Sequence, residues 1–315
     1  MSKNPDTSFK AGFIAVVGRP NVGKSTLVNA LLGEKVSIVS PKANTTRTRI
    51  HAILNGDNHQ AVLIDTPGFC GSETPLRKVL RRLAGNAPKD ADLTMVVTDI
   101  VKGEPKLTKL EKDVISAAQH GSGDRVVLVL NKVDRLKRKD DLLPWMAHYQ
   151  AETGISAIIP VSALKKDGLE KLESYLLDAL PESEAIFPRD LHTDQAERLM
   201  CEELLREQIL LLTHQEVPHS VAVVIESFLD ERPEDGEGGL CSIEGKIVVE
   251  RDSHKKIVIG KKGLKIKDIS TRARKEMESL LGSKVFLRMT VLVDDQWTKR
   301  AASLRKYGIQ AGDSA

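Results

Sequence analysis

The sequence predicts two domains: an α/β domain with a mostly parallel sheet flanked by helices, followed by a smaller α+β domain. A length of 315 residues is enough for two separate cores. In the first half, short apolar runs alternate with helical segments, and several of these runs end in a polar motif. A segment with two prolines, residues 181–191, then separates this half from a second one that mixes helices and strands.

The composition is that of an ordinary globular protein. Hydrophobic residues make up 41% and charged residues 29%, values typical of a chain that buries a core. No apolar run reaches the length of a membrane span, and the polar residues 1–10 do not fit a secretory signal, so secretion is not expected. Cys70, Cys201 and Cys241 lack metal-ligand or redox spacing, which favours reduced thiols. We therefore expect a monomer in the cytoplasm, with peripheral association at the inner face of the cell membrane left open.

The net charge of +3 hides one strongly basic segment. Between Gly245 and Lys275 there are eleven Lys or Arg residues and only three Asp or Glu, so the rest of the chain is acidic overall. A solvated helix face explains a small excess of this kind. A cluster this strong favours a polyanion as the partner.

A glycine loop follows the first apolar run. The run Phe13–Val17 leads into Gly-Arg-Pro-Asn-Val-Gly-Lys-Ser at residues 18–25, and residues 26–32 have helical spacing. This pattern lets backbone N–H groups and a helix N-terminus surround a phosphate chain. Lys24 would reach the β- and γ-phosphates, and the Ser25 hydroxyl would bind Mg²⁺. The residues predicted to hold the nucleotide here are Gly18, Arg19, Pro20, Asn21, Val22, Gly23, Lys24, Ser25 and Thr26.

Two further motifs supply groups that would respond to the γ-phosphate. The polar segment 40–49 reads as a loop, and a hydroxyl in it would bind Mg²⁺ only while that phosphate is present. Thr46 is the first choice for this hydroxyl and Thr45 the second. A short strand then ends at Asp65-Thr66-Pro67-Gly68, where a carboxylate would hold the water shell of the metal and the Gly68 N–H would bond the phosphate. The predicted metal ligands are Ser25, Thr46 and Asp65, and the predicted nucleotide contacts are Asp65, Thr66, Pro67 and Gly68.

A fourth motif predicts which base is bound. Residues 125–130 form an apolar run that leads into Asn131-Lys132-Val133-Asp134. The Asp134 carboxylate would accept from the ring N–H and the exocyclic amine of guanine, a donor pair that adenine lacks. Asn131 would tie this loop to the glycine loop, and the Lys132 stem would cover the base. After residues 158–161 the chain reaches Ser162, Ala163 and Leu164, and the Ala163 N–H would meet the guanine carbonyl. These motifs would line the carboxyl edge of one parallel sheet.

Together these motifs resemble the five signatures of a translation-factor-type GTPase. The combination of the glycine loop with Thr-Thr-Arg is similar to the bacterial Era, tRNA-modification and tandem-GTPase subgroup. The resemblance implies a P-loop G domain that hydrolyses GTP to GDP and phosphate with Mg²⁺. Phe69 stands where Ras-like proteins place a glutamine, so slow intrinsic hydrolysis is expected. The resemblance suggests that K⁺, held partly by Asn21, supplies positive charge, with Arg47 and Arg49 as rival sources. The predicted catalytic residues are Lys24, Thr46, Gly68 and Asn21.

The second half contains a second glycine motif. Gly260-Lys261-Lys262-Gly263 would let a nucleic-acid backbone approach the main chain while lysines neutralise phosphates. It resembles the G-x-x-G loop of a KH domain. The predicted order is a helix over 194–213, strands over 220–228 and 242–250, the loop, a helix over 264–281, a strand over 285–293 and a helix over 298–307. This order is similar to the type II KH domain of the Era family. The predicted RNA contacts are Lys255, Lys256, Ile259, Gly260, Lys261, Lys262, Gly263, Lys265 and Lys267.

The resemblance to the Era family extends over residues 13–308. It implies a switch that binds guanine nucleotide and single-stranded RNA, recognises 16S rRNA near its 3′ end, and assists assembly of the small (30S) ribosomal subunit. Two alternatives stay open: a non-enzymatic RNA-binding protein whose G domain is a nucleotide-stabilised scaffold, and a tRNA-modification GTPase, which would need extra helical domains. The expected parts are a flexible N-terminus (1–10), the GTPase domain (11–180), a linker (181–191), the KH domain (192–308) and a flexible tail (309–315).

Overall fold

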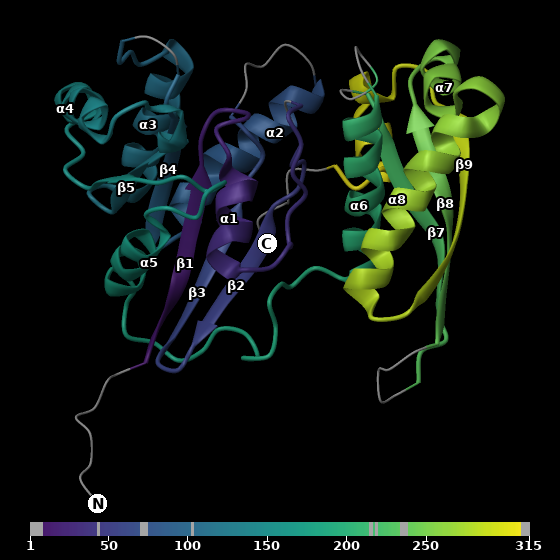
Figure 1. Ribbon diagram of the computed structural model, residues 1–315, viewed down its shortest axis with the longest axis horizontal. Helices are drawn as coiled ribbons and strands as arrows, with labels where there is room; N and C mark the ends of the chain where they lie inside the picture. The colour runs from purple at the N-terminus through teal and green to yellow at the C-terminus, as the bar shows by residue number, and fades with distance from the viewer. Residues whose placement is uncertain are drawn as a thin grey trace, which may run out of the picture.

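The computed structural model describes residues 9–42, 45–69, 75–101, 104–213, 217, 220–233 and 239–309. Two domains lie side by side, the first built on a sheet of six strands and the second on a sheet of three (Figure 1). Most of the expected N-terminal and C-terminal tails, and Cys70, lie outside the described residues. Among the described helices, none combines the length and the hydropathy needed to cross a bilayer.

The six-stranded sheet runs in the order β2-β3-β1-β4-β5-β6. Every neighbouring pair is parallel except β2 and β3, which are antiparallel. Because parallel strands end at one edge, the loops that follow β1, β3, β4, β5 and β6 gather there. The strands are β1 (Lys10–Val17), β2 (Ile50–Gly56), β3 (His59–Asp65), β4 (Leu93–Asp99), β5 (Val126–Asn131) and β6 (Ile158–Pro160).

Helices cover both faces of this sheet, which is why its strands are apolar on both sides. Val129 packs with α1 and α5, whereas its neighbours Leu128 and Leu130 pack with α3 and α4 on the opposite face. A capping box between Thr108 and Glu111 begins α3. The helices are α1 (Lys24–Leu32), α2 (Pro75–Asn86), α3 (Lys109–Ser122), α4 (Leu142–Thr153) and α5 (Leu169–Asp178), with short 3-10 helices at Ala87–Asp90, Val133–Arg135 and Lys139–Asp141.

In the second domain, α6 and α8 cover one face of a sheet ordered β7-β8-β9, and Trp297 and α9 pack on part of the other face. β7 is antiparallel to β8, and β8 is parallel to β9. The core joins apolar side chains of α6 and α8 to those of the sheet. The elements are α6 (Glu197–Leu212), β7 (Ala222–Asp230), β8 (Leu240–Val249), α7 (Asp252–Ile259), a 3-10 turn (Lys261–Gly263), α8 (Leu264–Leu281), β9 (Lys284–Val293), a 3-10 turn (Trp297–Lys299) and α9 (Ala301–Lys306).

The segment expected as a linker is fastened to the first domain. The Gln60 side chain accepts hydrogen bonds from the N–H groups of Ile186 and Phe187 at 2.7 and 2.8 Å. Thr193, expected in the second domain, forms a bridge with Ala52 of β2. Lys10, expected in the N-terminal tail, begins β1, and Ile309, expected in the C-terminal tail, is buried.

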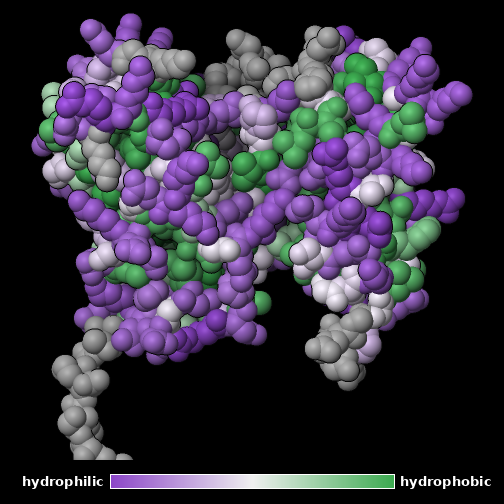
Figure 2. Space-filling view, viewed as in Figure 1, coloured by the Kyte–Doolittle hydropathy of each residue, from purple (hydrophilic) through white to green (hydrophobic). Residues whose placement is uncertain are grey.

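Two parts of the first domain pack directly on the second. Ile38, in the loop between α1 and β2, is buried in the apolar core of the second domain. Leu76 and Leu80 of α2 pack against Trp297 near the C-terminal end. On the face drawn in Figure 2, hydrophilic side chains predominate over both domains, with smaller apolar patches between them. Both contacts therefore begin in segments that follow a nucleotide motif, one after the glycine loop and one after the Asp-Thr-Pro-Gly motif.

Candidate nucleotide and nucleic-acid sites

The glycine loop connects β1 to α1 and leaves no room for a side chain at its two glycines. A Cβ on Gly18 would lie 2.4 Å from the carbonyl oxygen of Val97. Gly23 has a φ of 99°, and a Cβ there would lie 2.5 Å from the Asn131 side chain. Only glycine accommodates both restrictions, so the loop main chain is free to approach a bound anion.

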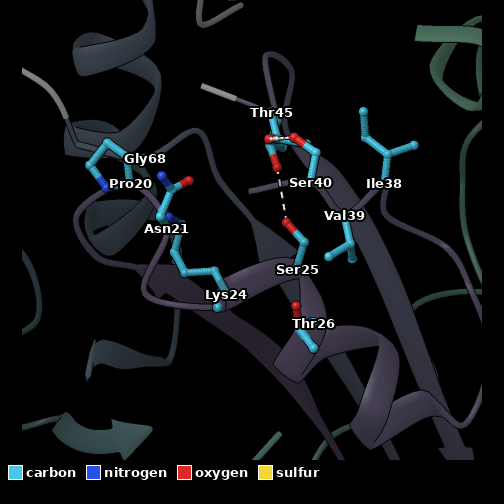
Figure 3. A pocket seen from close by; sticks show the side chains of 12 residues that line it. Pro20, Asn21, Lys24, Ser25, Thr26, Ile38, Val39, Ser40, Thr45 and Gly68 are labelled. Carbon is cyan, nitrogen blue, oxygen red and sulfur yellow. Dashed lines mark hydrogen bonds between the residues drawn. The ribbon is translucent and has the colours of Figure 1, made fainter. Parts of the chain in front are cut away.

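Lys24 begins α1 and is buried at 6% exposure. Its ammonium donates to the carbonyl oxygens of Gly18 and Arg19, each at 3.3 Å. Both acceptors belong to the glycine loop, so the positive charge lies against the loop backbone, in the pocket of Figure 3. This is the position from which a lysine neutralises phosphates held by the loop.

The structure distinguishes the two candidate threonines. The Ser25 and Thr46 hydroxyls are 3.0 Å apart. The Thr45 hydroxyl instead donates to the Lys42 carbonyl at 2.7 Å and lies 2.7 Å from the Ser40 hydroxyl (Figure 3). Thr46, not Thr45, therefore joins Ser25.

Asp65 ends β3 and is fully buried. Neither of its carboxylate oxygens forms a hydrogen bond with the described residues. Burial raises the pKa of this carboxyl, while the charge of Lys24 and the nearby hydroxyls of Ser25 and Ser37 act in the opposite direction. A buried carboxylate without hydrogen bonds, close to hydroxyl oxygens, is a donor set that fits a hard cation such as Mg²⁺.

The rest of the Asp-Thr-Pro-Gly motif lies against the glycine loop. The Thr66 hydroxyl donates to the Val16 carbonyl at 2.7 Å, and the Phe69 N–H donates to the Gly18 carbonyl at 3.0 Å. A Cβ on Gly68 would lie 2.8 Å from Cα of Pro20. Gly68 thus brings its backbone to the glycine loop, while the Phe69 ring is buried.

The predicted base-recognition residues meet at the same edge. The Asn131 amide donates to the Val22 carbonyl at 2.9 Å and Lys132 Nζ donates to the Asn21 carbonyl at 2.5 Å, so both are tied to the glycine loop. The Ser162 hydroxyl donates to Asp134 Oδ1 at 2.5 Å, which fixes the orientation of that carboxylate. The Ala163 N–H, predicted to meet the guanine carbonyl, donates to Asn131 Oδ1 at 3.1 Å, and the neighbouring Leu164 is exposed.

Arg47, one of the two arginines considered as rival sources of positive charge, lies at the boundary with the second domain. Its side chain is 3% exposed and donates to the Val221 carbonyl of the second domain at 2.6 Å. Burial and the charge of Arg206 lower the pKa of Arg47. Arg49 pairs with Asp90 at 3.2 Å. Both guanidinium groups are therefore engaged elsewhere, and neither is a source of charge at the phosphate site in this structure.

Two acidic residues at this edge, Asp99 and Glu111, were not predicted as part of the site. Asp99 ends β4 at the edge where the nucleotide motifs meet, and it pairs with Arg19 and Lys132. The Glu111 carboxylate accepts a hydrogen bond from Nε of Arg19 at 3.1 Å. An acidic residue at the end of a buried parallel strand was the available signal for Asp99. The local pattern around Glu111 indicates only a capping box with Thr108, and nothing in it marks the contact with Arg19, which lies far away in the sequence.

The second glycine motif joins α7 to α8. Gly260, Lys262 and Gly263 have φ values of 71°, 52° and 76°, so the turn presents backbone on its outer side. The loop lysines Lys261 and Lys262 are exposed. A groove beside this turn is lined by Leu212, Lys256, Ile257, Gly260, Lys261, Leu264, Lys265 and Asp268.

This groove combines positive charge, an α8 N-terminus and apolar side chains, a combination suited to unpaired nucleotides. Of the predicted RNA residues, Lys256, Gly260, Lys261 and Lys265 line it, whereas Lys255, Ile259, Lys262, Gly263 and Lys267 do not. Leu264, which is 66% exposed and lines the groove, was not among the predicted RNA contacts.

Comparison with known proteins places both sites in one family. A family model described as a 50S ribosome-binding GTPase matches residues 13–132, and a KH domain model matches residues 216–298. The GTPase Era of Trichlorobacter lovleyi is 41% identical over 305 residues, which cover 97% of this chain and 99% of that protein. The GTPase Era of Syntrophus aciditrophicus is 43% identical over 300 residues, 95% of each chain.

Solved structures agree over the same length. A crystal structure of Era in complex with MgGDPNP and nucleotides 1506–1542 of 16S ribosomal RNA is 37% identical, with a TM-score of 0.89 and coverage of 96% of this chain and 99% of that one. A variant of Aquifex aeolicus Era bound to GDP.AlF4- is 36% identical, also with a TM-score of 0.89, over 96% of this chain and 100% of that one. The predicted G domain followed by a KH domain is thereby confirmed. This chain belongs to the Era family of GTPases.

Proposed function

We propose that the first domain binds GTP and GDP through the residues gathered at the carboxyl edge of its sheet. The observation that carries this assignment is the approach of Ser25, Thr46 and the buried Asp65 beside the ammonium of Lys24. Ser25 and Thr46 would hold Mg²⁺ through their hydroxyls, and Asp65 would hold its water shell. Asp134, oriented by Ser162, would select guanine.

The chain contributes mainly positioning and charge to hydrolysis. Lys24 neutralises the β- and γ-phosphates, and the Gly68 N–H bonds the γ-phosphate. Mg²⁺, when bound, neutralises further phosphate charge. Phe69 has no amide to orient water, so intrinsic turnover is slow. We propose that K⁺, held partly by Asn21, supplies the remaining positive charge, since Arg47 and Arg49 are engaged elsewhere.

We propose that the KH domain binds single-stranded RNA at the groove beside Gly260 and Gly263. The RNA is 16S rRNA near its 3′ end, and the protein assists assembly of the 30S subunit. Support comes from the Era complex with nucleotides 1506–1542 of 16S ribosomal RNA, because that relative covers 96% of this chain. The 16S rRNA belongs to the small subunit, which favours 30S over 50S assembly.

The nucleotide state would reach the RNA domain through the α1–β2 loop. Thr46 would respond to the γ-phosphate, while the flanking Thr45 carbonyl accepts a hydrogen bond from Arg206 of α6. The Val39 N–H donates to Glu207 of the same helix at 2.8 Å. One loop therefore touches both the metal site and the first helix of the KH domain, which is the physical basis for a switch.

We further propose a monomer in the cytoplasm, divided into a GTPase domain (11–180), a linker (181–191) and a KH domain (192–308). The N–H groups of Ile186 and Phe187 in the linker donate to the Gln60 side chain of the first domain. These hydrogen bonds hold the linker on that domain and so limit how far the two domains can separate. Peripheral attachment to the membrane, which the sequence leaves open, has no supporting feature in the described part of the chain.

The test compares RNA affinity in two nucleotide states. A single-stranded RNA with the 3′-terminal sequence of 16S rRNA is titrated against the full chain with GDP and with a non-hydrolysable GTP analogue. We expect affinities that differ by about 5-fold or more. Equal affinities would refute the coupling. Turnover with Mg²⁺ and K⁺, with and without this RNA, tests the enzyme, because a scaffold G domain would release no phosphate under either condition.

A further inference from the structure

Asp99 lies at the centre of the nucleotide edge although no nucleotide motif contains it. It ends β4, which pairs with β1 on one side and with β5 on the other. β1 leads into the glycine loop, and β5 leads into Asn131 and Lys132. Asp99 is paired with Asn131 in the strand register and is 4% exposed. Its buried carboxylate therefore sits between the loop for phosphates and the loop for the base.

The two oxygens of this carboxylate face different loops. Oδ1 accepts from Nη2 of Arg19, which belongs to the glycine loop. Oδ2 accepts from Nζ of Lys132 at 2.9 Å. Arg135 also reaches Oδ2, at 3.4 Å, with a side chain that is half exposed. Arg19 also donates a hydrogen bond from Nε to the Glu111 carboxylate at 3.1 Å, which further fixes its side chain.

Without the carboxylate, this arrangement would not hold together. The cations of Arg19 and Lys132 approach the same buried group, and like charges brought this close repel each other when nothing lies between them. Lys132 also donates to the Asn21 carbonyl at 2.5 Å, so its ammonium has one acceptor in the glycine loop and one in Asp99. Two acceptors fix the direction of the lysine stem, which is the part expected to cover the base.

We infer that Asp99 is a positioning residue that locks the glycine loop to the guanine-recognition loop through Arg19 and Lys132. The lock holds the phosphate-binding and base-binding halves of the site at one separation, so that a guanine nucleotide engages both at once. Pre-organisation of this kind raises affinity by lowering the cost of ordering the loops on binding. The inference rests on the proposed function, because it concerns the same nucleotide.

The first test replaces Asp99 by asparagine, which keeps the size and removes the charge. We expect the Kd for GDP, measured by calorimetry on the full chain with Mg²⁺, to rise by about tenfold to a hundredfold, as for loss of a hydrogen bond to a charged group. The control is Asp113→Asn on the exposed face of α3, the same chemical change away from every site. Its Kd should stay within about twofold of the native value.

The second test does not require the Asp99 variant to fold. Arg19→Met and Lys132→Met are made singly and together while Asp99 is kept. If Asp99 links the two loops, losing its contact with either Arg19 or Lys132 is enough to break the link. The double variant should therefore lose less affinity for GDP than the product of the two single losses.

The outcomes separate the inference from the proposed function. Multiplicative losses in the native background would overturn the inference, and so would unchanged or tighter GDP binding by a folded Asp99→Asn variant. Tighter binding would mean that Asp99 only opposes the charge of the phosphates. A native chain that fails to bind GDP would refute the proposed function itself, whereas native binding with unaffected variants would refute the inference alone.

Discussion

The guanidinium of Arg47 donates a hydrogen bond of 2.6 Å to the carbonyl oxygen of Val221, and so joins the loop that carries Thr46 to the KH domain. The same guanidinium lies 5.9 Å from the centre of the Trp297 ring. From the other side, Arg206 of α6 donates to the Thr45 carbonyl. The predicted nucleotide sensor is thus held between two buried arginines at the domain boundary, one from each domain.

Replacing Arg47 by methionine tests whether this contact transmits the nucleotide state. The RNA affinities measured with GDP and with a GTP analogue should converge to within about twofold, because the loop is no longer fastened to the KH domain. The free energy of unfolding should change by only about 1 kcal/mol, since the lost hydrogen bond is offset by relief from burying a charge beside Arg206.

The matched control is Arg49→Met, a change two residues further along the chain, directly before β2. Arg49 pairs with Asp90 at 3.2 Å and donates to the Leu83 carbonyl, so these polar contacts stay within the first domain. Its variant should keep the native difference between the two nucleotide states. Loss of that difference in both variants would show that the loop is merely destabilised.

The substitution Asp134→Asn should change the base preference of the site from guanine to xanthine. The carboxylate accepts a hydrogen bond from Ser162 at 2.5 Å, so its orientation is fixed before the base arrives. An amide in its place presents a donor, which suits the extra carbonyl of xanthine and repels the exocyclic amine of guanine. We expect GDP affinity to fall by about a hundredfold and XDP affinity to rise, as measured by competition. Native GDP affinity in this variant would remove Asp134 from the base site.

Gly263, in the turn beside the RNA groove, offers a test of RNA binding there. Its φ is 76°, a region that aspartate and asparagine tolerate better than other side chains, and no atom lies within 4 Å of a Cβ placed there. Gly263→Asp should weaken binding of single-stranded RNA by about tenfold or more through repulsion of phosphates. GTP turnover without RNA should be native, because the loop belongs to the other domain.

Gly263→Asn carries the same shape without the charge and should keep RNA affinity within about threefold of native. Gly260 is a poorer choice, because a Cβ there would lie 2.6 Å from that of Lys265 and the turn would have to move. Equal losses with aspartate and asparagine would mean that backbone freedom, not charge, is what the groove requires.

The structure brings most of the residues predicted for the nucleotide site together, and these residues could be picked out because the signals that mark them are local. The glycine loop and the Asp65 motif each depend on neighbours a few residues away, and the helix predicted over 264–281 has the observed bounds. Arg47 could not be placed in this way, since its partners Val221 and Trp297 come more than a hundred residues later. Such pairings depend on how two complete domains dock, which no local pattern records.

Cys201 gives a prediction about pH that is independent of both sites. Its side chain is fully buried in the KH core, and burial raises the pKa of the thiol to about 12. An unfolded thiol ionises near pH 8.5, so above that pH the unfolded state loses a proton that the folded state keeps. The unfolded state is then favoured, and stability falls as the pH rises from about 8.5 towards 12.

Between pH 8 and pH 10 this difference corresponds to about 2 kcal/mol of unfolding free energy. Cys201→Ala should lower stability at pH 8 by leaving a small cavity, yet it should lose about 2 kcal/mol less than the native chain on going to pH 10. Urea unfolding at both pH values measures how the free energy of unfolding changes with pH in the native chain and in the Cys201→Ala variant. Parallel slopes would show that the Cys201 thiol ionises as readily in the folded chain as in the unfolded one, and would place water in the core that α6 and β8 enclose.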